Sequence, residues 1–429
     1  MKKFLTRLTL MSSLVLAACS SGAEEGSDNT ADNGGTGTLS FLLSEEPSET
    51  NALNNAIHKW AEETGNEVET LVIPYDDQLT KFPLMVKNND VPDLVATTRL
   101  TRLFPEEFTD LSEEIDTSIF DETALKIISQ NYTSDAVYAA PNQYTVTNYY
   151  YNKDAFEAAG IEAPTLENPW TLDELYDNAA KLKESGNVKY GLAVDFSRAR
   201  YDNLMYSNGG SMTEKEGDEF VVTINSDENI QTLEKFVELN NSDVMPKVIW
   251  SGGSSDNPAD YFQNGDVGIL LSGSWNYEKF NNEISSFDFA VMPSPIGSLQ
   301  ASTITGGSGL AVPSTAANKD LAIDFLEWLY EEENYLEYLA ADKGISFITE
   351  FVYEDEDPDV AADYAILKAE MANVADEFLI DEQSEWRNHL DNEYRDYLRQ
   401  AVSGELSAQE ALDGFAKDLS EKSGWTIKE

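Results

Sequence analysis

Cysteine and histidine are nearly absent from this chain of 429 residues, which has one Cys and two His. A single Cys excludes an intramolecular disulfide and any site built from several cysteines. Two His leave little material for a Cys/His zinc site. Basic residues are also scarce, with 28 Lys and Arg against 79 Asp and Glu and a net charge of −51. A surface this acidic repels phosphate backbones and anionic lipids, so nucleic acid is not an expected partner.

Apolar residues are present in the amounts that a folded protein needs. Hydrophobic residues make up 41% of the chain and aromatic residues 11%, which excludes global disorder despite the charge. The length allows two or three domains, or one large bilobal one. The apolar run near the N-terminus covers residues 8–18 and is shorter than the ~20 residues that span a bilayer.

The N-terminus has the features of an export signal. Lys2, Lys3 and Arg7 precede the apolar run, which ends in Ala18 and the single Cys19. This pattern resembles the bacterial lipoprotein signal, in which the Cys carries lipid; an ordinary secretory signal with a chance Cys is the alternative. We predict a signal peptide over residues 1–18, and a lipidated Cys19 with a flexible linker over residues 19–38. Acyl chains alone would then hold the protein at the outer face of the cell membrane.

The remainder of the chain alternates predicted strands and helices. The first strand is expected at residues 39–43, a helix follows and ends near Gly65, and strands at 68–73 and 93–98 flank a second helix that reaches Asn89. Later strands are predicted at 191–196, 267–272 and 287–292, and a helix at 318–330. This order favours an α/β fold, with a parallel sheet covered by helices on both faces.

Four stretches in this region resemble one family. They are residues 91–95 (VPDLV), 138–141 (YAAP) with 150–161 (YYNKDAFEAAGI), 262–275 (FQNGDVGILLSGSW) and 306–320 (GGSGLAVPSTAANKD). Together with the lipoprotein signal they are similar to the extracellular solute-binding proteins of bacterial ABC importers, in particular the sugar-binding group that includes maltose-binding protein. The resemblance extends from about Leu39 to the C-terminus.

The resemblance implies a two-lobed, periplasmic-binding-protein-like α/β fold of type II, with a hinge that the chain crosses more than once. Residues 39–145 plus 305–345 would form lobe 1, and residues 146–304 plus 346–429 would form lobe 2. It also implies a monomeric, non-catalytic receptor that captures a carbohydrate between the lobes and delivers it to permease subunits. The alternatives are a secreted glycoside hydrolase, which needs two facing carboxylates, and a binding protein for a non-sugar solute.

Ligand residues are expected where strands end, because open α/β sheets bind ligands at the carboxyl ends of strands. Trp275 matches the family position whose indole stacks on ligand, with packing between the lobes as the alternative. Thr98 and Arg99 follow a predicted strand, although the Arg departs from the maltose-binding pattern and is alternatively a surface residue. Glu45 and Glu46 follow the first strand, as ligand-binding acids or as solvated charges.

The resemblance also indicates several further candidates. Tyr144 and Thr145 lie in the stretch that crosses between lobes, and Thr145 stands where maltose-binding proteins carry a Glu. In the next loop Tyr201 is the stronger candidate and Arg200 the weaker. The remaining candidates are Gly306 and Gly307, which either approach ligand or shape the hinge, and Trp386, for which core packing is favoured over stacking.

Other chemistry finds little support in the residues. The acidic stretch 354–359 lacks the spacing of an EF-hand, and we expect no metal and no cofactor. The chain has no HExxH, P-loop or Gly-x-Ser-x-Gly motif. His58 is expected on the surface of a helix.

Overall fold

A computed structural model describes residues 36–44, 47, 51–97, 99–129, 135–252, 257–348, 350–351, 355–384 and 386–428. Contacts divide the chain into Met1–Thr36 and Gly37–Glu429, and the second of these forms one compact α/β unit. Its strands are β1 Thr38–Leu43, β2 Glu67–Val72, β3 Leu94–Thr97, β4 Ala140–Asn152, β5 Tyr190–Val194, β6 Thr213–Glu216, β7 Glu219–Val222, β8 Val267–Gly273, β9 Phe289–Met292, β10 Thr305–Ala311 and β11 Thr426–Ile427.

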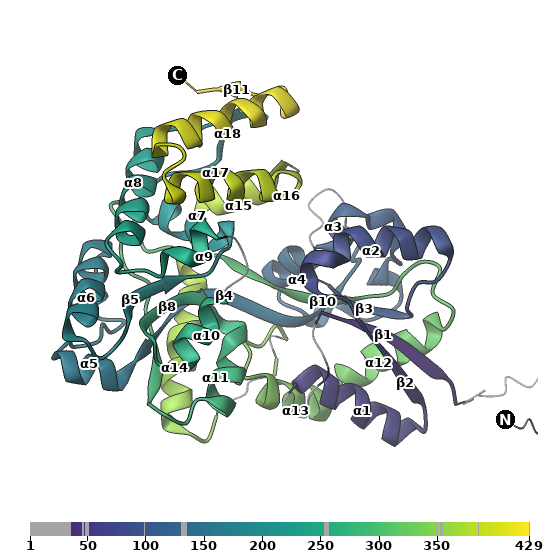
Figure 1. Cartoon of the computed structure of the whole chain (residues 1–429). Coiled ribbons are helices and arrows are strands. Elements are labelled where there is room, and N and C mark those ends of the chain that lie inside the picture. The colour runs from purple at the N-terminus through teal and green to yellow at the C-terminus, as the bar shows by residue number, and fades with distance from the viewer. Residues whose placement is uncertain are drawn as a thin grey trace, which may run out of the picture. The chain divides into compact units, whose positions relative to one another are not determined.

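Helices alternate with these strands along much of the chain (Figure 1). The α-helices are α1 Ala52–Thr64, α2 Tyr75–Asn88, α3 Leu100–Leu103, α4 Glu122–Ser129, α5 Lys153–Ala159, α6 Leu172–Ser185, α7 Arg198–Ser207, α8 Asp227–Asn241, α9 Lys247–Ser251, α10 Pro258–Gln263, α11 Tyr277–Glu283, α12 Lys319–Leu329, α13 Glu332–Asp342, α14 Pro358–Glu370, α15 Asp376–Glu382, α16 Trp386–His389, α17 Asp391–Ser403 and α18 Ala408–Ser423. Short 3₁₀ turns are η1 Pro105–Glu107, η2 Leu111–Glu113, η3 Thr117–Ile119, η4 Ser274–Asn276 and η5 Met371–Asn373.

The first helix shows how local sequence sets these bounds. The Asn51 side chain accepts a hydrogen bond from the Asn54 amide and caps the start of α1. Gly65 ends the helix in the left-handed conformation with φ 75°, which costs glycine little. The predicted helix end near Gly65 is therefore confirmed, and His58 is exposed on this helix as expected.

The main sheet has the order β2-β1-β3-β10-β4-β8-β5, with β9 also paired to β4. The first three strands are parallel, as the alternation of strands and helices predicted. The sheet as a whole is mixed, because β10 runs antiparallel to both β3 and β4, and β4 runs antiparallel to β8. The expectation of a parallel sheet was wrong for these central strands, since alternation along the chain does not reveal which distant strand will insert between neighbours.

Helices cover both faces of the sheet at its β1 end, as predicted. Phe41 points to the face that carries α1 and α12, where its ring lies 6.5 Å from that of Phe325. The next residue, Leu42, points to the opposite face and packs in a separate cluster with Phe82 of α2. Alternation of side chains along a strand produces this division. The observed β1 begins at Thr38, one residue earlier than expected.

Strand β4 links two groups of strands. Its residues from Ala140 to Val146 pair with β10, whereas the part from Thr147 to Asn152 pairs with β8 and β9. The change of partners lies one residue beyond the expected boundary between lobes at 145/146. The residue ranges of the lobes stay a prediction, because Gly37–Glu429 form one compact unit.

Candidate functional site

Trp275 stands at the carboxyl end of a fully buried strand. Every residue of β8 is buried, whereas Trp275 in the following η4 turn is 40% exposed. A Cβ at Gly273 would lie 1.9 Å from Cζ3 of the indole, so glycine is required for the ring to lie back over the strand end. An exposed indole held in place by a buried strand is a suitable surface for stacking against a ligand.

Arg200 covers part of this indole. Its guanidinium carbon lies 4.6 Å from the centroid of the Trp275 ring, within the range of a cation–π contact. Its Nη1 atom donates a hydrogen bond of 2.6 Å to Oγ1 of Thr147 on β4. The side chain is buried, so α7, β4 and η4 together hold the guanidinium in one position. Arg200, the weaker candidate in the sequence, is thus the one that the structure places beside Trp275.

Asp195 completes this group, and the sequence analysis missed it. It directly follows β5, and its carboxylate accepts a hydrogen bond from the Ser272 hydroxyl. Asn276 Nδ2 donates to the same Ser272 oxygen at 2.8 Å, and Arg200 Nε lies 4.0 Å from Asp195 Oδ2. Burial raises the pKa of Asp195 to about 6, against the lowering effects of the Arg200 charge and the Ser272 hydrogen bond. We call Thr147, Asp195, Arg200, Ser272, Trp275 and Asn276 the Trp275 site.

The sequence contained a feature that could have identified Asp195 as a site residue, namely its position at the end of a predicted strand. The predicted strand at 191–196 included this residue, whereas β5 ends at Val194. With the observed end, Asp195 becomes the first residue after the strand, the position where ligand contacts are expected.

Thr145 and Gly306 lie paired beside this site. They are opposite each other on β4 and β10, and Thr145 is on the same face of β4 as Thr147. A Cβ at Gly306 would lie an ordinary 3.6 Å from Thr145 Oγ1. A Cβ at Gly307 would lie only 2.1 Å from the Gln143 carbonyl oxygen, so β10 can pack against β4 at this point only with a glycine. The structure thus favours a shaping role for Gly307.

Three aromatic candidates occupy other positions. Tyr201 is completely buried against Phe236 and Tyr394, and Tyr144 is 2% exposed. The ligand contact expected of these two residues stays a prediction. Successive helical residues point about 100° apart, which places Arg200 at the site and the next residue in the core. Trp386 packs partly against the core, the role we favoured, with its ring 5.9 Å from that of His389.

Arg99 makes a second arginine–aromatic pair elsewhere in the sheet. Its guanidinium carbon lies 4.1 Å from the centroid of the Tyr75 ring, and its Nη2 donates to the Tyr75 carbonyl at 2.9 Å. Both residues follow the carboxyl ends of strands, β3 and β2, and Tyr75 is 42% exposed. The sequence analysis missed Tyr75, although this aromatic residue lies only two positions beyond the predicted strand at 68–73. The candidates Cys19, Glu45, Glu46 and Thr98 lie outside the described residues.

A buried ion pair connects α3 to α15. Arg102 Nη1 lies 3.0 Å from Glu382 Oε2, and their side chains are only 10% and 6% exposed. The same guanidinium also donates to the Glu382 carbonyl. The preceding residue, Asp381, anchors α15, because its carboxylate accepts from the Tyr206 hydroxyl at 2.7 Å and the Thr213 hydroxyl at 2.6 Å. Two segments 280 residues apart are thereby joined.

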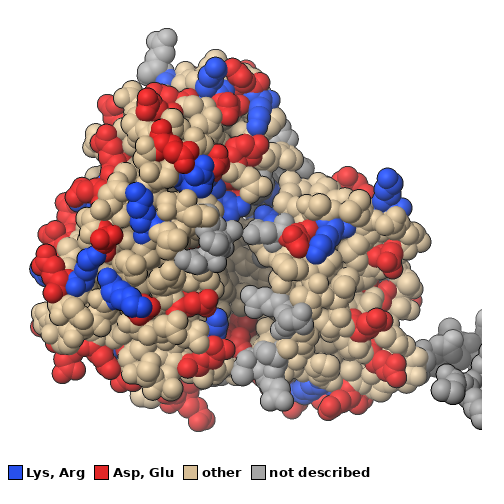
Figure 2. Space-filling view, viewed as in Figure 1, with Lys and Arg blue, Asp and Glu red and all other residues tan. Residues whose placement is uncertain are grey.

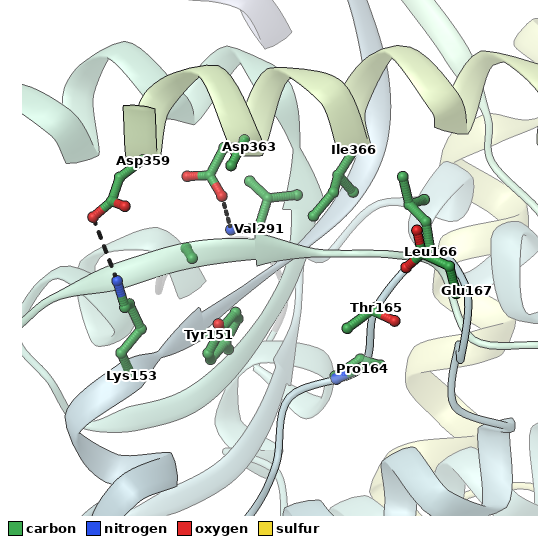
Figure 3. Close-up of a pocket in the computed structure, with 12 residues that line it drawn as sticks. Tyr151, Lys153, Pro164, Thr165, Leu166, Glu167, Val291, Asp359, Asp363 and Ile366 are labelled. Carbon is green, nitrogen blue, oxygen red and sulfur yellow. Dashed lines mark hydrogen bonds and ion pairs between the residues drawn. The ribbon is translucent and has the colours of Figure 1, made fainter. Parts of the chain in front are cut away.

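A pocket of about 310 Å³ lies in another part of the chain, between α14, β9 and the loop at 164–167 (Figure 3). The Lys153 amine lies 3.6 Å from the Asp359 carboxylate at one end of this pocket. Asp363 accepts a hydrogen bond from the Val291 amide at 2.9 Å. Both polar groups therefore already have partners within the protein.

The surface of the protein is rich in acidic side chains (Figure 2), and the described residues form no candidate metal site. Acidic side chains are spread widely over the face shown in Figure 2, which is hollowed near its centre. Among the described residues, no group of three or more His, Cys, Asp or Glu is placed to hold a metal ion. In the same part of the chain, no helix has both the length and the apolar character needed to cross a membrane.

The family model for bacterial extracellular solute-binding proteins matches residues 46–335, about two thirds of the chain. The chain belongs to this family, which confirms the resemblance seen in the sequence.

Curated relatives are distant. A galactooligosaccharide-binding protein of Bacillus subtilis is 22% identical over 376 residues, covering 85% of this chain and 83% of the relative. A putative binding protein of Brucella abortus is 24% identical over 64% of this chain, which spans 66% of that protein's length, slightly under two thirds. The sn-glycerol-3-phosphate-binding periplasmic protein of Escherichia coli is 28% identical over about half of each chain, 51% and 52%.

Solved structures share the fold. An ABC substrate-binding protein of Listeria monocytogenes, in complex with cycloalternan, superimposes with a TM-score of 0.75 at 19% identity, covering 91% of this chain and all of that one. Maltose-bound MalE3 of T. maritima gives 0.75 at 16% identity, with 90% and 99% covered. The two-lobed α/β fold of periplasmic binding proteins, predicted from the sequence, is confirmed by this likeness.

Proposed function

We propose that this protein is the substrate-binding lipoprotein of an ABC importer. It captures a carbohydrate, an oligosaccharide in our proposal, and delivers it unchanged to permease subunits in the membrane. The protein acts as a monomer at the outer face of the bacterial cell membrane, held there through lipid on Cys19. Family membership and the galactooligosaccharide-binding relative both support this proposal.

The arrangement around Trp275 is the observation that carries the proposal. A sugar ring presents faces of C–H bonds, which pack on an aromatic ring, and a rim of hydroxyls, which need hydrogen-bond donors and acceptors. The Trp275 site offers an indole that is 40% exposed, with the Arg200 donor and the Asp195 acceptor beside it. Trp275 and Asp195 follow the carboxyl ends of β8 and β5, where α/β sheets bind ligands, and Arg200 reaches them from α7.

The mechanism is a shift between conformations rather than a reaction. Ligand that contacts both lobes stabilises the form in which the lobes are closed around it, and the open form lacks half of those contacts. The permease then needs to recognise only the closed, loaded form. Because nothing in this cycle breaks a bond in the sugar, the protein requires no catalytic residue and no cofactor.

A thermal-shift screen with oligosaccharides tests the proposal. A bound sugar at a concentration of 100 Kd should stabilise the protein by about 2.7 kcal/mol and raise its unfolding midpoint accordingly. Chromatography after incubation should return the sugar intact. Hydrolysis products would support the glycoside hydrolase instead, and no shift with any saccharide would contradict carbohydrate binding.

The lipid anchor needs a separate test. Cys19→Ser should move the protein from the membrane fraction to the medium. Retention in the membrane fraction would contradict anchoring through this residue.

One observation favours a second candidate ligand. The Escherichia coli relative is named for sn-glycerol 3-phosphate, a phosphorylated non-sugar solute. The same thermal-shift screen should therefore include sn-glycerol 3-phosphate.

A further inference from the structure

We propose that Arg102 and Glu382 form a latch that holds together the two groups of strands linked by β4 in the ligand-free protein. The latch is the ion pair between α3 and α15, and neither residue belongs to the Trp275 site. Both are positioning residues, which act on a ligand only through the arrangement of the protein around it. The effect of the latch on ligand affinity rests on the proposed function, whereas its effect on the conformation of the free protein does not.

Helix α3 is fixed to the first group of strands, which contains β1, β2 and β3. Thr97, the last residue of β3, accepts a hydrogen bond from the Leu100 amide through Oγ1 at 2.9 Å. The Leu100 side chain is completely buried in the cluster that also contains Leu42 of β1 and Phe82 of α2. Arg102, two residues further along α3, is therefore held by this part of the sheet.

Helix α15 is fixed to the second group of strands, on the side of β5. Asp381, directly before Glu382, accepts a hydrogen bond from the Thr213 amide at 2.9 Å, in addition to the hydroxyl contacts described above. Phe378, about one turn earlier in α15, packs against Tyr206 with ring centroids 6.2 Å apart. Tyr206 belongs to α7, the helix that follows β5. Glu382 is therefore held by α7 and β6, on the opposite side of β4 from Arg102.

The contact between these two parts is made by buried groups. Arg102 donates through Nη1 to the Glu382 carboxylate at 3.0 Å, and through Nη2 to the Glu382 carbonyl oxygen. A contact that exists only when two parts are close together opposes their separation. Buried ion pairs add little to overall stability, because loss of hydration offsets the attraction, and their best-attested role is to select one arrangement. The pair thus selects an arrangement in which the two groups of strands are close.

A latch that forms without ligand changes the equilibrium between open and closed forms of the free protein. Under the proposed function, ligand binds the closed form. Its apparent affinity then increases with the fraction of free protein that is already closed. Loss of the latch should therefore weaken ligand binding, although neither residue contacts the indole of Trp275. Couplings of this kind change affinity by about 5-fold to 150-fold, and we expect about tenfold here.

Reversal of one charge tests the latch directly. Arg102→Glu places two carboxylates against each other, and separation of the two parts relieves their repulsion. Small-angle X-ray scattering of the ligand-free protein should then give a larger radius of gyration. The double variant Arg102→Glu/Glu382→Arg restores opposite charges and should return the radius to that of the unaltered protein. A general loss of stability does not produce this recovery.

Lys126→Glu is the matched control, because it changes the net charge by the same amount as Arg102→Glu. Lys126 pairs with Glu122 inside α4, and their side chains are 59% and 83% exposed, so this pair does not join the two parts. The control should keep the radius of gyration of the unaltered protein. Equal expansion of the control and of Arg102→Glu would show that the added negative charge alone separates the parts, and the latch would be overturned.

Titration calorimetry with a galactooligosaccharide and with maltotetraose measures the effect on binding. Arg102→Glu should bind the sugar about tenfold more weakly than the unaltered protein, and the charge-swapped double variant should recover most of this loss. An unchanged affinity in Arg102→Glu would overturn the role of the latch in binding. If the unaltered protein binds no saccharide, the proposed function fails, while the scattering result still decides whether the latch exists.

A second variant covers the case in which Arg102→Glu does not fold. Arg102→Met combined with Glu382→Leu leaves no buried charge without a partner, so it should fold, but it cannot form the ion pair. Its radius of gyration should also exceed that of the unaltered protein. An unchanged radius in this variant or in folded Arg102→Glu, or a charge-swapped variant that stays expanded, would overturn the proposal.

Discussion

The guanidinium carbon of Arg200 lies 4.6 Å from the centroid of the Trp275 ring, although the two residues are far apart in sequence and come from α7 and η4. The contact places a guanidinium, which carries hydrogen-bond donors, over the face of the indole. A stacking surface and polar groups for a hydroxyl rim are thus held together before any ligand arrives, which reduces the conformational entropy lost on binding.

Trp275→Ala should weaken sugar binding by about tenfold to a hundredfold, because the exposed indole supplies the stacking surface. Calorimetry measures the affinity. Trp425→Ala is the matched control: Trp425 packs on Phe220, with ring centroids 4.8 Å apart, next to β11 and outside the Trp275 site. Equal affinities for Trp275→Ala and the unaltered protein would contradict the assignment of this site.

Substitutions of Tyr201 distinguish a role in core packing from a role in ligand binding. Tyr201→Ala should destabilise the protein by about 3–5 kcal/mol, because it leaves a cavity beside Phe236 and Trp250. Tyr201→Phe keeps the packing and should leave sugar affinity within about twofold of the unaltered protein. Chemical unfolding and calorimetry check the two expectations. A large loss of affinity in a stably folded Tyr201→Phe would support the ligand contact that we first expected.

Replacing only one partner of the ion pair between Arg102 and Glu382 should lower the stability of the protein strongly. Glu382→Leu leaves the guanidinium buried without its carboxylate and should lower the free energy of unfolding by about 3–5 kcal/mol. The double variant with Arg102→Met should recover part of this loss, since neither charge then remains.

A double-mutant cycle by chemical unfolding measures the coupling between these two residues. The exposed pair Lys126 and Glu122, whose nitrogen and oxygen atoms lie 2.6 Å apart, is the control, and Lys126→Met should cost less than about 1 kcal/mol. Additive losses for Arg102 and Glu382 would contradict their coupling.

Asp342 should make stability fall with rising pH. Burial raises its pKa to about 7, although a hydrogen bond from Gln143 opposes this change. The folded state therefore holds the proton up to about pH 7, whereas the unfolded state releases it near pH 4. The stabilising contribution of this group is complete below about pH 4 and is lost as the pH rises through 7.

Two variants of this region should respond in opposite ways. Asp342→Asn cannot ionise, so between pH 5 and 8 it should gain about 1–3 kcal/mol in unfolding free energy relative to the unaltered protein. Gln143→Ala removes the hydrogen bond that favours the charged form, so its stability should fall more steeply over the same range. Unfolding in denaturant at each pH measures both. If the difference in unfolding free energy between Asp342→Asn and the unaltered protein does not change with pH, the raised pKa of Asp342 is contradicted.

Local patterns in the sequence were sufficient for the elements and for the family. The rhythm of Leu53, Ile57 and Trp60, closed by Gly65, is that of α1. Such signals depend on residues within one or two turns of each other, so they can be seen without the fold. The position of Trp275 after an apolar run was likewise visible, and the structure places it at the exposed end of β8.

Tertiary structure alone decided which side chains meet at Trp275. Asp195, Arg200 and Thr147 reach the site from β5, α7 and β4, and only the pairing of β4 and β5 with β8 brings them together. The same packing directs Arg200 to the site and Tyr201, its neighbour, into the core. Contacts between distant segments depend on sheet order, register and the rotation of each helix, and spacing along the chain does not determine any of these three.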